Sequence, residues 1–241
     1  MRFIVNEKNM RKFIYTQVSL ALSLWFATSL SAQDCEAYFP MNEGAVRVME
    51  MFDKKDKPEG KMTYTVKDIT TEDAVTYIHV GMQMEDKKGK EVYATEMTME
   101  CEAGVFRVDM KNYMQAGMLP DMGDMEVAVD SRNLEFPSDL EVGMELPDGY
   151  ISTSMSSGGM SLMNMQVDVT NRKVEARESI TTPAGTFDCY KISQESKVKS
   201  IMSMTTRSVE WIAKDVGVVR SESFDKKGEL EHYSILTEFK N

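Results

Sequence analysis

The feature that most constrains this chain is an alternation of apolar and polar residues with a period of two, which starts at Ala45 and continues over most of the sequence. The runs Met62–Asp68 and Ile78–Met84 show it clearly. Successive side chains of an extended strand point to opposite faces, so this pattern indicates strands with one face buried and the other exposed to solvent.

Turn-forming clusters rich in Gly, Pro, Asp and Lys separate these runs. They lie at residues 53–60, 85–89, 102–104, 157–159, 183–185 and 225–228. Turns placed in this way between alternating runs predict hairpins. We therefore predict an all-β fold, a single curved antiparallel sheet or barrel-like meander of about ten to twelve strands in up-and-down order.

One segment departs from the alternation. In Lys111–Met118, the residues Met114 and Met118 stand four apart, which predicts one short helix that ends before Pro120. The remaining sequence contains no Pro- or Ser-rich linker and no clear repeat. We expect residues 33–241 to form a single β-rich domain.

The N-terminus has the layout of a secretory signal peptide. Basic residues precede a mostly apolar run, Phe13–Leu30, and small residues follow at Ser31 and Ala32. This order predicts a cleaved signal peptide over residues 1–32 and an exported protein, periplasmic or extracellular. A membrane anchor is the alternative, but polar residues interrupt the apolar run, so we expect no stable membrane span. Lipid attachment at Cys35 is disfavoured because Asp34 precedes it.

The charge of the chain excludes some functions. Removing residues 1–32 takes away four of the 28 basic residues and one of the 39 acidic ones, which changes the net charge from −11 to −14. Such a surface argues against nucleic acid as a partner. The chain has only two histidines, which leaves little room for a His-rich metal site or triad chemistry.

The chain has 22 methionines, several of them in Met-x-Met pairs that place two thioethers on one face of a strand. We prefer to interpret this face as core, because methionine fills irregular space. A flexible cavity for an apolar ligand is the second interpretation, and Cu(I) capture by thioethers the third. No metal site or cofactor is assigned. The candidate ligand-binding residues are Met82, Met84, Met97, Met99, Met163, Met165, Met202 and Met204.

The three cysteines allow one disulfide in an exported protein. Cys189 lies in the middle of a predicted strand, where a buried free thiol is expected. Cys35 stands near the start of the mature chain and Cys101 lies just before a turn. If a disulfide forms, we favour Cys35–Cys101.

No catalytic motif is present: the sequence has no Gly-x-Ser-x-Gly elbow, no His-Glu-x-x-His pair and no phosphate-binding glycine loop. Carboxylates on strands, such as Asp188 and Glu210, leave a hydrolase open as a remote alternative, but we interpret them as part of a solvated sheet face. Trp211 is expected in the core or at its rim. We predict that the protein is not an enzyme.

Several segments together resemble a known family. The run Asn171–Ile192 carries most of the resemblance, and Cys35–Gly44, Leu134–Pro137, Leu146–Gly149 and Val209–Glu222 extend it over nearly the whole mature chain. They are similar to the TapB family of exported proteins from Bacteroidetes-type bacteria, which is grouped with a clan of domains of unknown function. The resemblance implies an exported, curved, barrel-like β fold and no catalytic residues.

These observations favour an exported, non-enzymatic β protein of the cell envelope. We expect it to bind a hydrophobic ligand or an envelope protein. Copper handling by methionine is the main alternative, and a carboxylate-dependent hydrolase is a weaker one.

Overall fold

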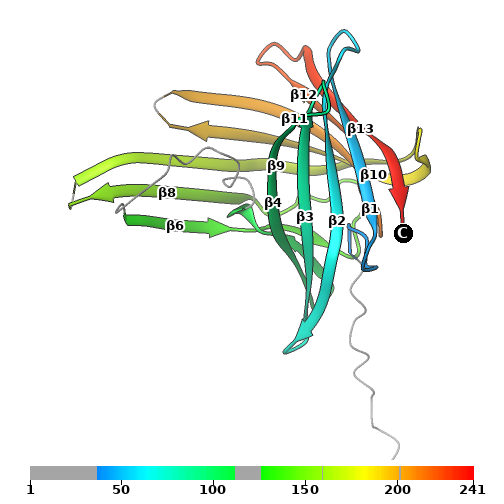
Figure 1. The fold of residues 1–241 in the computed structure, drawn as a ribbon, viewed down its shortest axis with the longest axis horizontal. Coiled ribbons are helices and arrows are strands. Elements are labelled where there is room, and N and C mark those ends of the chain that lie inside the picture. The colour runs from blue at the N-terminus through cyan, green and yellow to red at the C-terminus, as the bar shows by residue number, and fades with distance from the viewer. Residues whose placement is uncertain (1–36, 112–125, 159, 201) are drawn as a thin grey trace, which may run out of the picture. The chain divides into compact units, whose positions relative to one another are not determined.

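The computed structural model describes residues 37–241, apart from 112–125, 159 and 201. The chain divides into two units, residues 1–33 and 34–241, and the first of them, with the predicted signal peptide, lies outside the described residues. The second unit is one antiparallel sheet of thirteen strands (Figure 1). The strands are β1 (Val46–Asp53), β2 (Pro58–Glu72), β3 (Val75–Asp86), β4 (Glu91–Glu102), β5 (Val105–Val108), β6 (Glu126–Arg132), β7 (Leu134–Pro137), β8 (Gly149–Ser157), β9 (Met160–Thr182), β10 (Gly185–Lys199), β11 (Ser203–Ala213), β12 (Gly217–Phe224) and β13 (Leu230–Lys240).

The two edges of the sheet are joined in the chain by a single residue. The strand order is β6-β8-β9-β10-β11-β12-β13-β1-β2-β3-β4-β5-β7, so β6 and β7 stand at opposite edges. Only Asn133 separates them in sequence, and there the chain changes its partner from β8 to β5. Strands that change partners at a bend form the corners of curved sheets. This corner makes the sheet nearly closed and barrel-like.

A bulge bends the longest strand, β9. Asn171 has a left-handed backbone with φ of 54° in the middle of the strand, and the register with β10 shifts nearby. Asn and Asp reach this region more readily than other non-glycine residues. In Figure 1, β6 and β8–β10 run across the direction of β2–β4, so the sheet turns through a large angle.

The all-β prediction is confirmed, with corrections. The sheet has thirteen strands rather than ten to twelve, since the short strands β5 and β7 have few alternating residues to reveal them. All six predicted turns connect adjacent strands. The described residues form no α-helix, and the predicted helix Lys111–Met118 lies outside them except for Lys111.

Three hairpins share one turn chemistry. Asp53 and Asp86 end their strands and Asp225 directly follows β12, each before a Lys-Lys pair. Each carboxylate accepts hydrogen bonds from the backbone N–H groups two and four residues later. These bonds lower the pKa of Asp53 and Asp86. An Asp side chain that caps its own turn is a local signal, which is why these turns are readable from sequence.

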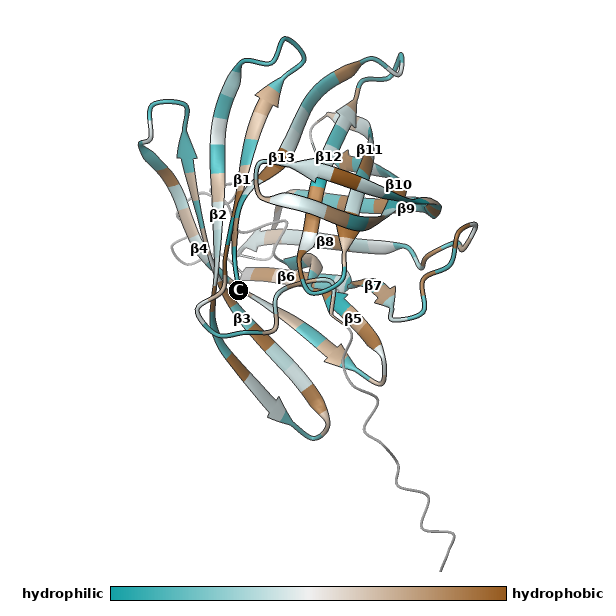
Figure 2. Cartoon of the chain, turned by 90° about the vertical axis from the view of Figure 1, so that its right-hand side faces the viewer, coloured by the Kyte–Doolittle hydropathy of each residue, from teal (hydrophilic) through white to brown (hydrophobic). Residues whose placement is uncertain are grey.

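The apolar residues form two clusters. The larger one lies inside the curved sheet and includes Ile78, Val80, Phe106 and Phe136. The smaller one packs around Trp211 against the opposite face of β10–β12 and includes the buried thiol of Cys189. Figure 2 shows hydrophobic residues on strands of both regions. Strands β10–β12 therefore have apolar neighbours on both faces.

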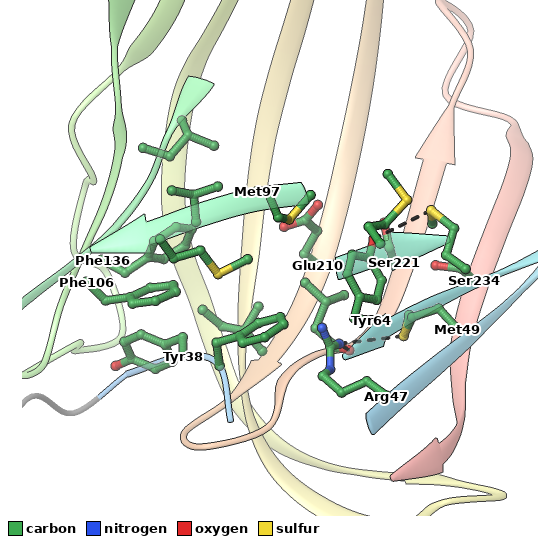
Figure 3. A pocket seen from close by; sticks show the side chains of 18 residues that line it. Tyr38, Arg47, Met49, Tyr64, Met97, Phe106, Phe136, Glu210, Ser221 and Ser234 are labelled. Atoms are coloured by element: carbon green, nitrogen blue, oxygen red, sulfur yellow. Dashed lines mark hydrogen bonds between the residues drawn. The ribbon is translucent and has the colours of Figure 1, made fainter. Parts of the chain in front are cut away.

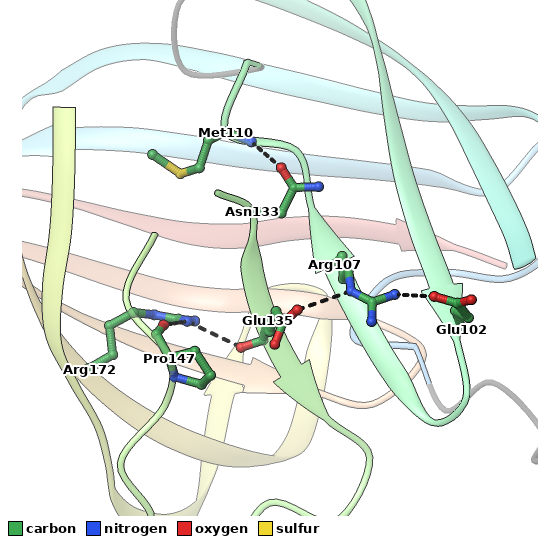
Figure 4. A network of polar contacts seen from close by, with 7 residues as sticks. All are labelled: Glu102, Arg107, Met110, Asn133, Glu135, Pro147 and Arg172. Atoms are coloured by element: carbon green, nitrogen blue, oxygen red, sulfur yellow. Dashed lines mark hydrogen bonds and ion pairs between the residues drawn. The ribbon is translucent and has the colours of Figure 1, made fainter. Parts of the chain in front are cut away.

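A buried arginine joins three separate segments. Arg172 follows the bulge in β9, and its Nη1 donates hydrogen bonds to the backbone oxygens of Pro147 (2.6 Å) and Glu135 (3.2 Å) (Figure 4). Its guanidinium lies 4.7 Å from the centre of the Phe136 ring. On the same strand β7, the Glu135 carboxylate pairs with Arg107. The network ties the bend of β9 to β7 and to the chain before β8.

Replacing Arg172 by methionine should lower the free energy of unfolding by about 3 kcal/mol, because buried backbone carbonyls lose their donors. Arg107→Met, which breaks more exposed ion pairs, should cost less than about 1 kcal/mol. Urea unfolding of both variants measures the difference. Equal losses would contradict the role given to Arg172.

The bend at Asn171 gives a second prediction. Asn171→Val should destabilise the fold by about 2 kcal/mol, because a β-branched residue is strained in the left-handed region. Asn171→Gly should cost clearly less, although both variants lose the hydrogen bond from Asn171 to Glu195. Thermal unfolding compares the two variants. A valine variant as stable as the glycine variant would show that the backbone does not hold this conformation.

Candidate functional site

The interior of the sheet holds a cavity of about 400 Å³ (Figure 3). Its volume is in the range typical of small-molecule sites, about 300–1,000 Å³. Five methionines, five aromatic residues and four aliphatic residues give it an apolar wall, and four residues are polar. The lining residues are Tyr38, Phe39, Arg47, Met49, Met62, Tyr64, Met82, Met97, Met99, Phe106, Val108, Leu134, Phe136, Glu210, Ile212, Val218, Ser221 and Ser234.

The methionine wall follows from the register of β1–β4. Met49 on β1 stands opposite Met62 on β2, and Tyr64 on β2 stands opposite Met82 on β3. Residues directly opposite each other in an antiparallel pair share a face. The alternation in each strand therefore places these side chains on the inner face together with Met97 of β4.

Aromatic rings close one side of the cavity. Tyr38, from the chain before β1, packs against Phe106 and Phe136, with ring centres 6.5 Å and 6.0 Å apart. The Tyr38 hydroxyl donates a hydrogen bond to the backbone oxygen of Pro137. Figure 3 shows these three rings on one side of the cavity, with Arg47 and Met49 on the other.

Arg47 brings a buried positive charge to the cavity wall. It is 4% exposed, and its guanidinium carbon lies 5.1 Å from the centre of the Phe39 ring and 5.3 Å from that of Tyr64. It donates a hydrogen bond to the backbone oxygen of Val218, whereas its Nε has no partner among the described residues. Burial lowers the pKa of Arg47 to about 10, so the group stays protonated at neutral pH.

Glu210 faces the cavity from β11 (Figure 3). Desolvation raises the pKa of its carboxyl, and the positive charge of Arg172 opposes that rise. Within the described part of the chain the carboxyl has no hydrogen bond or ion pair. The interpretation of Glu210 as part of a solvated face is wrong, because Glu210 is half-buried and lines the cavity. Asp188 does lie on an exposed face, paired with Arg177.

The predicted methionines separate into three groups. Met82, Met97 and Met99 line the cavity. Met84, Met163 and Met165 are half-buried or buried but do not line it. Met202 and Met204, 81% and 59% exposed, lie near the tip of the β10–β11 hairpin, so neither lines the cavity.

Several lining residues were not among the predicted ligand-binding residues. Met49 and Met62 lie on the same inner faces, and the period-two pattern could have indicated both. Arg47 and Glu210 could not be found in this way, because an isolated charge in an alternating strand usually marks the solvent face.

The cysteines offer no reactive group among the described residues. Cys189 is free and fully buried, as expected, and desolvation raises the pKa of its thiol to about 12. Cys101 is buried and disulfide-bonded. Cys35 lies outside the described residues, so the pairing Cys35–Cys101 stays a prediction. The described residues contain no group of three His, Cys, Asp or Glu side chains that could hold a metal ion.

The fold and this cavity define a barrel-like all-β protein with an internal, mostly apolar pocket. The chain belongs to the DUF3108-like family, whose model matches residues 42–236. This assignment agrees with the prediction of a family of unknown function, but it does not confirm the TapB family name.

Two solved structures are similar to this one. A predicted lipoprotein from Parabacteroides distasonis is 26% identical, with a TM-score of 0.70, over 86% of this chain and 100% of that chain. A predicted exported protein with a YmcC-like fold from Bacteroides fragilis is 23% identical, with a TM-score of 0.69 and the same coverage. No protein with curated annotation matches the chain. No described segment forms a helix with the length and hydropathy needed to cross a membrane.

The position of Arg47 can be tested through Gly217. A Cβ at Gly217 would lie 3.1 Å from the guanidinium carbon of Arg47 and 3.1 Å from the Tyr38 carbonyl oxygen. Gly217→Ala should therefore destabilise the fold by about 1–3 kcal/mol more than Gly44→Ala, through overpacking. Both glycines have positive φ, but a Cβ at Gly44 would meet nothing within 4 Å. Urea unfolding gives the comparison, and equal losses would contradict the contact.

Proposed function

We propose that this protein is an exported, non-enzymatic binding protein of the cell envelope, and that it holds an apolar or amphipathic small molecule in the cavity of its barrel. The observation that carries the proposal is the cavity of about 400 Å³, with its wall of methionine and aromatic side chains. Flexible thioethers suit a site that adapts to its ligand, because they repack at little cost.

The envelope location is supported from two directions. The N-terminal sequence has the layout of a signal peptide, and one similar solved structure is described as a predicted lipoprotein and another as a predicted exported protein. An exported binding protein is consistent with both.

Binding agrees better with the lining residues than the two alternatives. A carboxylate-dependent hydrolase needs two acids that face each other, whereas Glu210 is the one carboxyl among the residues that line the cavity. Copper capture needs thioethers free to ligate. The sulfurs of Met49 and Met62 already accept contacts from Arg47 and from the Tyr64 hydroxyl.

The test is titration with N-phenyl-1-naphthylamine, a neutral apolar probe whose fluorescence rises on burial. Met97→Trp fills part of the cavity and should weaken probe binding at least tenfold, about 1.4 kcal/mol. Met204→Trp adds the same ring at an exposed site and should leave the affinity unchanged. Unfolding midpoints confirm that both variants fold.

Two results would overturn the proposal. One is a folded wild-type protein that binds no probe. The other is equal probe binding by the Met97 and Met204 variants, because binding would then occur outside the cavity. A Cu(I) competition assay on the wild type separates the copper alternative, which requires at least one tightly held ion per chain.

A further inference from the structure

A row of polar side chains crosses the otherwise apolar wall of the cavity. Glu210 on β11 stands opposite Ser221 on β12, and Ser221 stands opposite Ser234 on β13. All three line the cavity (Figure 3). Neighbouring strands are about 4.8 Å apart, so the row spans roughly 10 Å, about the length of a glyceryl ester with a hydrogen bond at each end.

The row has unused hydrogen-bonding capacity. Neither serine hydroxyl has a partner among the described residues, and the Glu210 carboxyl has none there either. The three residues are half-buried, and polar groups that face a largely apolar cavity without a protein partner are available to hydrogen-bond a bound molecule. A bound molecule with polar groups of its own would supply the partners that this face lacks.

The surrounding charges select the type of head group. The carboxyl of Glu210 disfavours an anionic head. The guanidinium of Arg47 lines the same cavity, and the charge of Arg172 acts on Glu210, so a cationic head is disfavoured as well. Hydroxyl groups carry no charge and both donate and accept, which suits a carboxyl next to two serines.

The rest of the cavity suits a short hydrocarbon chain. The methionines of β1–β4, whose strands follow β13 in the sheet, and the rings of the aromatic side give apolar contacts beside the row. A water molecule occupies about 30 Å³ in the liquid, so the cavity has room for on the order of ten to fifteen groups of that size. A medium-length acyl chain with a glycerol head is of this size.

We propose that Glu210, Ser221 and Ser234 bind the head of the ligand, and that the ligand is a neutral amphiphile with hydroxyl groups, of the monoacylglycerol class. This inference rests on the proposed function, since it names the class of molecule that the cavity takes. Glu210 accepts a hydrogen bond from one hydroxyl, one serine binds the second hydroxyl, and the other serine donates a hydrogen bond to the ester carbonyl oxygen. The apolar chain lies along the methionines.

The experiment displaces N-phenyl-1-naphthylamine from the full mature chain with three ligands of equal chain length: 1-monooctanoylglycerol, octanoate and octylamine. The wild type should bind the glycerol ester at least tenfold more tightly than either charged ligand. Glu210→Met should lower the affinity for the glycerol ester at least tenfold and leave the affinity for the probe within twofold of the wild-type value. Ser221→Ala and Ser234→Ala should each lower the affinity for the glycerol ester about three- to tenfold, the effect of losing one hydrogen bond.

Two further variants distinguish the effect of the Glu210 charge on binding from a general effect of substitution on folding. Glu210→Gln keeps hydrogen-bonding groups without the charge. Its affinity for the glycerol ester should therefore stay within about threefold of the wild-type value, and it should bind octanoate more tightly than the wild type does. Glu231→Met removes an exposed carboxylate on β13 and should change nothing.

The outcomes distinguish this inference from the proposed function. A wild-type protein that binds no probe overturns both. Two outcomes overturn the inference alone and leave an apolar binding protein. In the first, the wild type binds the probe but shows no preference for the glycerol ester. In the second, the Glu210→Met variant keeps its affinity for that ester.

Discussion

The buried guanidinium of Arg172 is the interaction on which the shape of the barrel depends. It stands at the bend of β9 and donates to backbone oxygens of Glu135 and Pro147, which belong to separate segments. Taking a guanidinium out of water is costly, and hydrogen bonds and the Phe136 ring offset that cost here. Since Glu135 lies just after the corner at Asn133, this one cation holds together the places where the sheet changes direction.

The cavity follows from this corner. A sheet whose edges are connected by one residue cannot flatten, and the bend of β9 keeps its walls apart. In small closed barrels, side chains fill the interior, whereas larger barrels enclose space. The methionines of β1–β4 occupy part of that space with long, unbranched side chains. Their conformational freedom makes the remaining volume adjustable rather than fixed.

The sequence predicted what is encoded locally. Alternation shows the strands, and an Asp before two lysines shows a turn, because each pattern acts through neighbouring residues. The polar lining was not predictable in this way. Val209 and Trp211 belong to the second apolar cluster. Because Glu210 alternates with them, the pattern predicted that its carboxyl lies on the solvent-exposed face. Only the full sheet shows that the last residues of β11 have neighbours on both faces, the cavity on the side of Glu210 and the second cluster on the side of Trp211. In the same way, Met204 belongs to an alternating strand, but the strand extends beyond the core there.

The same contrast supports the proposal that this cavity serves recognition rather than reaction. Catalysis needs several groups held rigidly in relation to the reacting atoms, and thioether walls do not hold a substrate in one position. A polar row on strands is different, because hydrogen-bonded neighbours set its spacing. In the proposed complex, the wall adapts to a chain of variable shape while Glu210 and the two serines keep the head in one place. Arg47 lines the same cavity, the positive charge of Arg172 acts on Glu210, and desolvation raises the pKa of the Glu210 carboxyl. In such surroundings an unpaired charge on the ligand is penalised far more than in water, so the proposed site selects its ligand by the polarity of the head group rather than by the length of the chain.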